Sequence, residues 1–321
     1  MPQDATHPQL AVDCALARDA EGVHPIANTG NPARVADIVF VHGLAGGSHS
    51  TWTYGTEGEP GHFFWPTELG RDLPEFGIWS LGYEAGVVPW FGADGMPIED
   101  RAVNLKHKLV NHGLGQLPLV FIVHSMGGLM VKEIIVQSRT ANDAEWSQLV
   151  EQVAGIVFCG TPHRGSHVAG MAKNWDAVLR TKTHIREMAA GERHLDRLHQ
   201  RFVEWQQQSG AKIETYTENI GLKRHAVWAR VLPAVVIVPP DSANPQMAGC
   251  RCIPCNDDHV SLVKPQCRQH NVYAGVLRFV KAAVVPPKVA APRSDLPAGN
   301  ADVRQMILQI LREEGLLPLR R

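Results

Sequence analysis

The stretch that decides the fold is PLVFIVHSMGGLMVKE, which runs from Pro118 to Glu133. Its first half is a short, β-branched apolar run typical of a buried strand, and its second half has the composition of a buried helix. Ser125 lies at the bend between them. The stretch departs from the usual G-x-S-x-G pattern, because Val123 stands in place of the first glycine.

Two interpretations of Ser125 are open. A serine at a sharp strand-to-helix turn presents its hydroxyl above the sheet as a nucleophile, and the following amide, that of Met126, then becomes an oxyanion donor. Alternatively, Ser125 is only the N-cap of a buried helix. The apolar strand before it and the two glycines after it favour the nucleophile, since glycine allows a strained backbone and close packing.

Short apolar runs alternate with helical patterns along most of the chain. This alternation of strand and helix patterns predicts an α/β fold with a mostly parallel central sheet and helices on both faces. The chain is long enough for one large domain of this kind, which we place at residues 1–283. The predicted strands are 36–41, 76–83, 117–123, 153–160, 212–218 and 234–240, and the predicted helices are 98–113, 127–138 and 271–283.

Two regions interrupt this alternation of strands and helices. Residues 162–210 predict a helical insertion after the strand that follows the bend. This insertion either forms a cap over a site or packs against the sheet edge. Residues 284–300 are rich in proline and alanine and indicate a linker. Residues 301–321 predict an amphipathic helix, which needs a partner to be stable. That partner is its own domain or a second copy of the chain, so a homo-oligomer is one expectation.

Bulk properties narrow the functional class. The 321 residues carry a formal net charge of −1, so no global field favours nucleic acid or an anionic membrane. The first residues lack a basic segment followed by an apolar run, so we expect no secretory signal. No apolar stretch approaches the length of about 20 residues that a membrane-spanning helix needs. These features predict a cytoplasmic protein without an integral membrane segment.

The late cysteines allow two interpretations. Cys250, Cys252 and Cys255 form C-x-C-x-x-C, and Cys267 follows as a possible fourth ligand of a structural zinc ion. The alternative, a surface loop with free thiols, is favoured because a second C-x-x-C pair is missing. The predicted chemistry needs no cofactor and no metal.

A serine nucleophile requires a base and an acid. A histidine must remove the hydroxyl proton, and where a strand–turn–helix carries the serine, the order along the chain is serine, acid, histidine. His259 and His270 follow the last predicted strand, and His259 is favoured because it lies in a loop. The acid commonly follows the second strand after the bend, which favours Glu218, with Asp241 as the alternative.

With these residues placed, the sequence resembles the serine active site-containing (SERAC-like) α/β-hydrolases, distant relatives of the GPI inositol-deacylases. The stretches that carry the resemblance are VFVHGLAGGSHSTW, FFWPTELGRDLPEFGIWSLGYEA, HSMGGLMVKEIIV, GIVFCGTPHRGS, IETYTEN, IVPPDSA and DDHVSLVKP. The resemblance implies the α/β-hydrolase fold and a Ser-His-acid esterase or lipase. It carries over Ser125 and His259, favours Glu218, and adds the amide of Leu44, after His42-Gly43, as the second oxyanion donor.

The expected substrate is a small-molecule or lipid ester with an apolar group. Aromatic side chains follow the first two predicted strands, where they either border the cleft or pack beneath the loops. The rival hypotheses are a non-catalytic binding or signalling module and an acyltransferase. The aromatic residues are Trp52, Phe63, Phe64, Trp65, Trp90 and Phe91.

Overall fold

The computed structural model describes residues 19–84, 97–140, 143–163, 185–222 and 236–284. Contacts divide the chain into two units, and every described residue belongs to the first, Met1–Val284. The predicted linker and tail helix therefore lie outside the described residues. The described elements are β1 (Gly22–Ala27), β2 (Ala36–Val41), β3 (Thr53–Tyr54), β4 (Phe63–Phe64), α2 (Trp65–Asp72), β5 (Phe76–Gly82), α3 (Ile98–Asn111), β6 (Leu119–His124), α4 (Met126–Thr140), α5 (Ala144–Glu151), β7 (Val153–Cys159), α7 (Ile185–Ser209), β8 (Lys212–Glu218), α8 (Pro240–Ala243), β9 (Arg251–Cys255) and α9 (Asn271–Val284), with short 3-10 turns at Ser50–Trp52 and Ser261–Val263.

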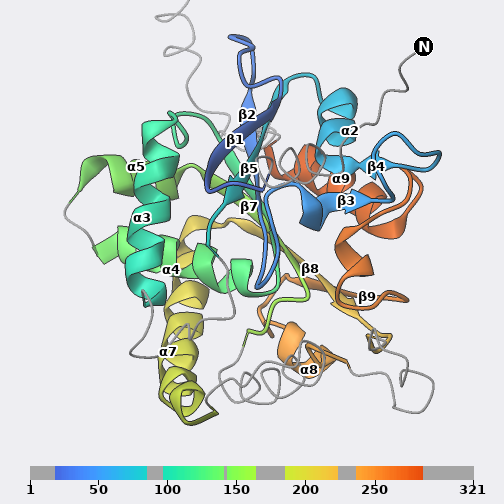
Figure 1. Cartoon of the computed structure of the whole chain (residues 1–321). Coiled ribbons are helices and arrows are strands. Elements are labelled where there is room, and N and C mark those ends of the chain that lie inside the picture. The colour runs from blue at the N-terminus through green and yellow to red at the C-terminus, as the bar shows by residue number, and fades with distance from the viewer. Residues whose placement is uncertain (1–18, 85–96, 141–142, 164–184, 223–235, 285–321) are drawn as a thin grey trace, which may run out of the picture. The chain divides into compact units, whose positions relative to one another are not determined.

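Seven of the described strands form one twisted sheet, in the order β1-β5-β2-β6-β7-β8-β9 (Figure 1). β1 pairs antiparallel with β5, and the other neighbours are parallel. The expectation of a mostly parallel sheet is therefore confirmed. The central strand β6 and its neighbour β2 are buried along their whole length, which explains their unbroken apolar sequences.

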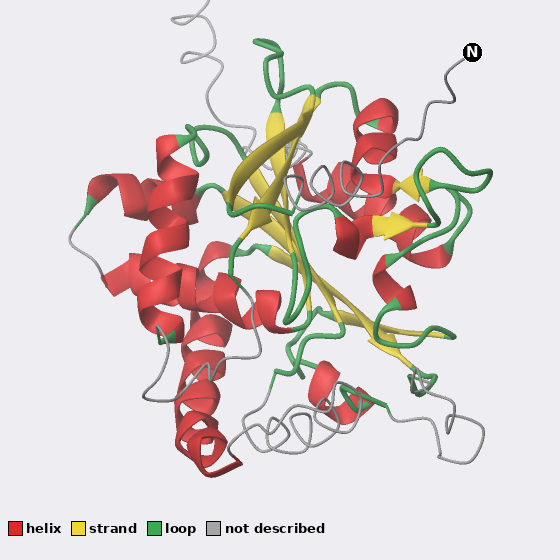
Figure 2. Cartoon of the chain, viewed as in Figure 1, coloured by secondary structure: helices red, strands yellow, loops and turns green. Residues whose placement is uncertain are grey.

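Helices cover both faces of the sheet (Figure 2). Alternate residues of β2 point to opposite faces, as the pleat requires. Ile38 and Phe40 pack into a core shared with α2 and α9. Val39 and Val41 pack into a second core shared with α3, α4, α5 and α7. The strand-to-helix turn at Ser125, called the elbow from here on, is therefore followed by a helix, α4, that is itself buried between other helices.

One predicted strand is wrong where it can be examined. Residues 236–239 are loop, and the helix α8 begins at Pro240. The place beside β8 is taken instead by β9, which falls in the cysteine stretch interpreted as a surface loop. β9 is an edge strand with only Cys255 fully buried, and it contains Pro254, so its sequence lacks the apolar run of a central strand.

The helical insertion contributes the long helix α7, while residues 164–184 lie outside the described part of the chain. Four apolar side chains of α7 are spaced at helical intervals and pack into the same core as α4. The four buried residues are Leu195, Leu198, Phe202 and Trp205.

A histidine on α7 joins this helix to α3 and α4. Nε2 of His194 lies 3.1 Å from a Glu133 carboxylate oxygen, and Nδ1 lies 3.3 Å from Glu99. The hydrogen bond with Glu133, followed by the charges of Glu133 and Glu99, raises the pKa of His194. The protonated imidazole thus stabilises the folded protein below the ordinary histidine pKa, and this contribution is lost as the pH rises through the raised value.

We therefore predict that His194→Gln lowers the melting temperature more at pH 6 than at pH 9. The expected difference at pH 6 is about 2–4 °C, the shift that follows from losing about 1 kcal/mol in a domain of this size. Thermal unfolding of both proteins at the two pH values tests this. An equal loss of melting temperature at both pH values would contradict an ion pair between protonated His194 and the Glu99 and Glu133 carboxylates.

Candidate active site

Ser125 occupies a strained turn between β6 and α4. Its φ angle is 52°, in the left-handed region that non-glycine residues rarely adopt. The turn is held because the Ser125 amide donates to the Cys159 carbonyl at 2.9 Å, and the Gly128 amide donates to the Ser125 carbonyl at 3.1 Å. The hydroxyl oxygen of Ser125 is buried and has no hydrogen-bond partner among the described residues. Strain and an unsatisfied polar atom together are typical of functional sites.

Two glycines, neither at position 123, let the chain approach this turn. A Cβ atom on Gly127 would collide with the His42 carbonyl oxygen and lie 2.6 Å from that of Val41. A Cβ atom on Gly43 would lie 2.7 Å from the Ser125 Cβ. Val123 meanwhile is fully buried in β6 between β2 and β7. The requirement for glycine therefore lies in the His-Gly loop and after the serine, so valine at 123 fits.

We predict that Gly127→Ala lowers the free energy of unfolding by about 1–3 kcal/mol or more, because the added methyl meets backbone that has no space to move. Gly30→Ala is a matched control, since a Cβ atom there has no neighbour within 4 Å. Urea unfolding of both variants measures the difference. Equal stabilities would mean that α4 and β2 do not approach each other this closely.

His42 fixes the loop that contains the predicted oxyanion donor Leu44. The Tyr83 amide donates to Nε2 of His42 at 3.3 Å, so Nδ1 carries the hydrogen and donates to the Gly43 carbonyl at 2.9 Å. Burial lowers the pKa of His42 to about 4, so this neutral form persists at physiological pH. With the Gly43 carbonyl held toward His42, the trans peptide turns the Leu44 N–H the opposite way.

Glu218 and His259 form a fully buried pair at the same edge of the sheet. Nδ1 of His259 contacts Oε2 of Glu218. The other carboxylate oxygen accepts the amides of Ile237 and Val238, at 2.6 and 2.9 Å. These amides explain why the predicted strand at 234–240 fails, because at Ile237 and Val238 the backbone donors serve a carboxylate instead of a sheet.

The alternatives for the acid and the base lie elsewhere. Asp241 is exposed in the first turn of α8. His270 lies 3.6 Å from Asp257. Of the two histidines and two acids considered from sequence, the structure brings together His259 and Glu218.

Sequence reasoning missed two groups that position His259 at this turn. His124, the residue before the serine, donates from Nε2 to the His259 carbonyl at 2.9 Å, and the two rings lie 4.7 Å apart. Gly160, with a φ angle of 56°, lies under the pair, since a Cβ atom there would be 3.1 Å from the His259 ring. The HSMGG motif contained the first signal, a histidine directly before the nucleophile.

Comparison with known proteins finds relatives of this sequence. The chain is 27% identical to protein SERAC1 of Bos taurus over 277 residues, and 27% identical to that of Homo sapiens over 279 residues. In sequence and in fold, the chain resembles the SERAC-like α/β-hydrolases. Each match covers 82% of this chain but only 41% of the relative, so the chain spans about two fifths of the length of these proteins. No family model matches the sequence.

Solved structures with a similar chain path include esterases, a lipase and a thioesterase domain. They include a carboxylesterase of Nitrososphaera gargenis, with 14% identity, a TM-score of 0.44 and coverage of 82% of this chain and 93% of that one. A soluble variant of monoglyceride lipase from Saccharomyces cerevisiae has 11% identity and a TM-score of 0.40, and the match covers 82% of this chain and 90% of that one.

The aromatic side chains singled out in the sequence divide into two groups. Trp52 and Trp65 have no exposed surface, and both pack edge-on against Phe40 in the core with α2 and α9. They therefore pack beneath the loops and do not border a cleft. Phe63 and Phe64, in β4, are half-buried. Trp90 and Phe91 lie outside the described residues.

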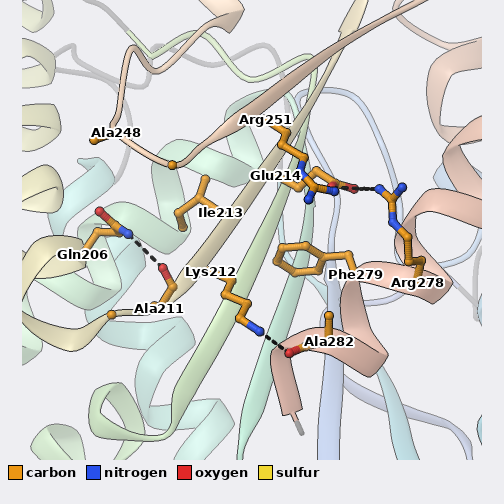
Figure 3. Close-up of a pocket in the computed structure, with 12 residues that line it drawn as sticks. Gln206, Ala211, Lys212, Ile213, Glu214, Ala248, Arg251, Arg278, Phe279 and Ala282 are labelled. Atoms are coloured by element: carbon orange, nitrogen blue, oxygen red, sulfur yellow. Dashed lines mark hydrogen bonds and ion pairs between the residues drawn. The ribbon is translucent and has the colours of Figure 1, made fainter. Parts of the chain in front are cut away.

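A cavity of about 440 Å³ lies far from Ser125, at the start of β8 (Figure 3). Lys212, Arg251 and Arg278 line it around Glu214, which pairs with Arg278 at 3.1 Å. The carboxyl end of β8 lies six residues beyond Lys212, roughly 20 Å away at the rise of an extended strand. This cavity is therefore not where an acyl group would meet the Ser125 hydroxyl.

The late cysteines do not converge. Cys250 packs against the core that contains α4, whereas Cys255 packs in the core on the other side of the sheet. Cys267 is exposed. Within the described ranges, no group of three or more His, Cys, Asp or Glu side chains is arranged to hold a metal ion. In the same residues, no helix combines the length and apolar content that crossing a membrane requires.

Proposed function

We propose that the chain is a serine carboxylic-ester hydrolase with Ser125 as nucleophile, His259 as general base and Glu218 as the acid. The observation that carries the proposal is the convergence of three separated elements: the strained turn at Ser125, the buried Glu218–His259 pair, and the Gly43 loop packed on the serine. Each element has a structural cost or constraint that packing alone does not explain.

The proposed reaction has two steps. The Ser125 hydroxyl attacks the acyl carbonyl while Nε2 of His259 takes its proton, and the collapsing intermediate expels the alcohol with that proton. Water then attacks the acyl-enzyme while His259 takes its proton. The second intermediate collapses to release the carboxylic acid as His259 returns that proton to the Ser125 oxygen. Glu218 orients the imidazole and stabilises its charged form. The amides of Leu44 and Met126 stabilise the oxyanion, and each such donor is worth about 3–4 kcal/mol in comparable enzymes.

The electrostatic environment supports these roles. The Glu218 carboxylate accepts two backbone hydrogen bonds besides its contact with His259, so its orientation toward the imidazole is fixed. The helix α4 begins at Met126, so its N-terminal partial positive charge lies where the oxyanion would form.

A panel of p-nitrophenyl esters from acetate to palmitate, assayed with purified protein, tests the function and the preference for an apolar acyl group. We expect turnover to rise with chain length beyond acetate. Absence of turnover on every ester would favour the non-catalytic module. Assays with added alcohols separate an acyltransferase, because ester products would then exceed free acid.

A further inference from the structure

Lys132, on the helix α4, is a buried lysine with no carboxylate partner in the described part of the chain. Its side chain has no exposed surface, and its ammonium nitrogen lies 2.7 Å from Nδ1 of His163 and 3.1 Å from Nδ1 of His199. Among the described residues no carboxylate forms an ion pair with it. Burial lowers the pKa of Lys132 well below its ordinary value. Glu133, the next residue, is turned to Gln137 and His194.

The hydrogen-bond directions leave one buried N–H donor, on His163, without an acceptor among the described residues. Nε2 of His199 lies 3.0 Å from the Pro245 carbonyl, so it carries the hydrogen, and Nδ1 accepts from Lys132. When Lys132 is protonated it donates to His163 as well, which places the His163 hydrogen on Nε2. That atom is buried and has no partner in the described part of the chain, and the same is true of the hydroxyls of Thr161 and Ser242.

These groups lie on the same side of α4 as the nucleophile. Ser125, Gly128 and Lys132 are spaced by three and four residues, which places them on one helix face. The rise of an α-helix sets the Cα atoms of Ser125 and Lys132 roughly 10 Å apart. Thr161 packs directly on Gly128, which lies between Ser125 and Lys132 along the chain. Burial does not separate this cluster from the candidate active site, because Ser125 and His259 have no exposed surface either.

We propose that Lys132 and His163, with Thr161 beside them, bind a compact oxyanion of the substrate, a carboxylate or a phosphate, within about 10 Å of the scissile carbonyl. The oxyanion supplies a counter-charge for Lys132 and an acceptor for His163 Nε2, neither of which the described residues provide. The histidine contacts hold the ammonium in place. The inference rests on the proposed function, since it names a substrate class for the same site.

The test compares acyl chains of equal length that differ in their end group. The probes are p-nitrophenyl hexanoate, mono-p-nitrophenyl adipate and p-nitrophenyl 5-phosphonopentanoate, in which four methylenes separate the acyl carbonyl from the end group. We expect wild-type protein to favour at least one anionic ester over the hexanoate by about tenfold or more in kcat/KM, the scale of a charge-assisted hydrogen bond. The better of the two anionic esters identifies carboxylate or phosphate as the natural end group.

Lys132→Met should reduce this ratio of anionic to neutral ester by about tenfold. Lys106→Met is the matched control, because Lys106 is also buried but lies on α3 over the Trp146 ring, 3.4 Å from its centre. The control should leave the ratio unchanged. If Lys132→Met does not fold, His163→Gln serves as the second variant.

A wild-type preference for the neutral ester would overturn the inference, and so would equal ratios in the Lys132 and Lys106 variants. Failure of the proposed function has a different signature, which is absence of hydrolysis of every ester. In that case calorimetric titration of the wild-type protein with monomethyl adipate and with methylphosphonate still tests the subsite. Binding that is lost in Lys132→Met supports it, and absence of binding contradicts it.

Discussion

Ser125→Ala should lower ester hydrolysis by roughly 10⁴-fold or more while leaving the fold intact, because no other group can form the acyl-enzyme. The removed hydroxyl makes no hydrogen bond among the described residues, so its loss leaves no partner unsatisfied. Steady-state kinetics on the best ester of the panel, together with thermal unfolding, measures both effects.

Ser138→Ala is the matched control for this result. Ser138 lies on the same helix α4 and is equally buried, but its hydroxyl donates to the Ile134 carbonyl at 2.7 Å, far along the helix from the elbow. We expect it to keep turnover within about twofold, as substitutions remote from the chemistry usually do. Similar activity in the two variants would assign the observed hydrolysis to a different nucleophile.

The second large effect concerns the acid. Glu218→Gln should lower kcat by about 10²–10⁴-fold, because the amide of glutamine can donate to Nδ1 of His259 and so leave the hydrogen on Nε2, where the serine proton must arrive. Asp241→Asn should change kcat less than about threefold. Asp241 is exposed on α8, and in the described part of the chain it makes no hydrogen bond or ion pair with His259 or Glu218.

The ranking of these two variants decides the assignment. Steady-state kinetics should be read together with circular dichroism, so that a folding defect in Glu218→Gln is recognised. A larger loss in Asp241→Asn would move the acid to α8 and remove the buried Glu218–His259 pair from the mechanism.

The centre of the fold was predictable from sequence because its strands are buried on both faces. The unbroken apolar run in β6 and the sharp change at Ser125 identify the elbow without reference to distant residues. The helix α3 was predictable for a similar reason, since Ala102, Leu105 and Leu109 share one buried face. Such signals are local, because the apolar pattern within one segment does not depend on how the rest of the chain is arranged.

The edges of the sheet were not predictable in this way. The apolar stretch before Pro240 looked like a strand, but Ile237 and Val238 direct their amides to Glu218, a residue about twenty positions earlier. β9 looked like a loop because an edge strand needs little apolar surface. Likewise, Lys132, His163 and His199 come from three separate segments, and only the tertiary structure reveals that they meet.

The Glu218–His259 pair lies between these extremes. Position in the chain favoured both residues, since Glu218 ends a predicted strand and His259 lies in a loop after the last predicted strand. What position did not reveal was the support around them: the Ile237 and Val238 amides on the carboxylate, and the His124 bond to the His259 carbonyl. These contacts depend on the packing of loops, which have no sequence period.

The most direct test of the central claim is labelling of the folded protein with a fluorophosphonate, followed by intact mass measurement and peptide mapping. The account predicts one adduct per chain, located on Ser125, with labelling slowed strongly in His259→Ala and absent in Ser125→Ala. Folded protein that remains unlabelled, or an adduct on another residue that persists in Ser125→Ala, would contradict it.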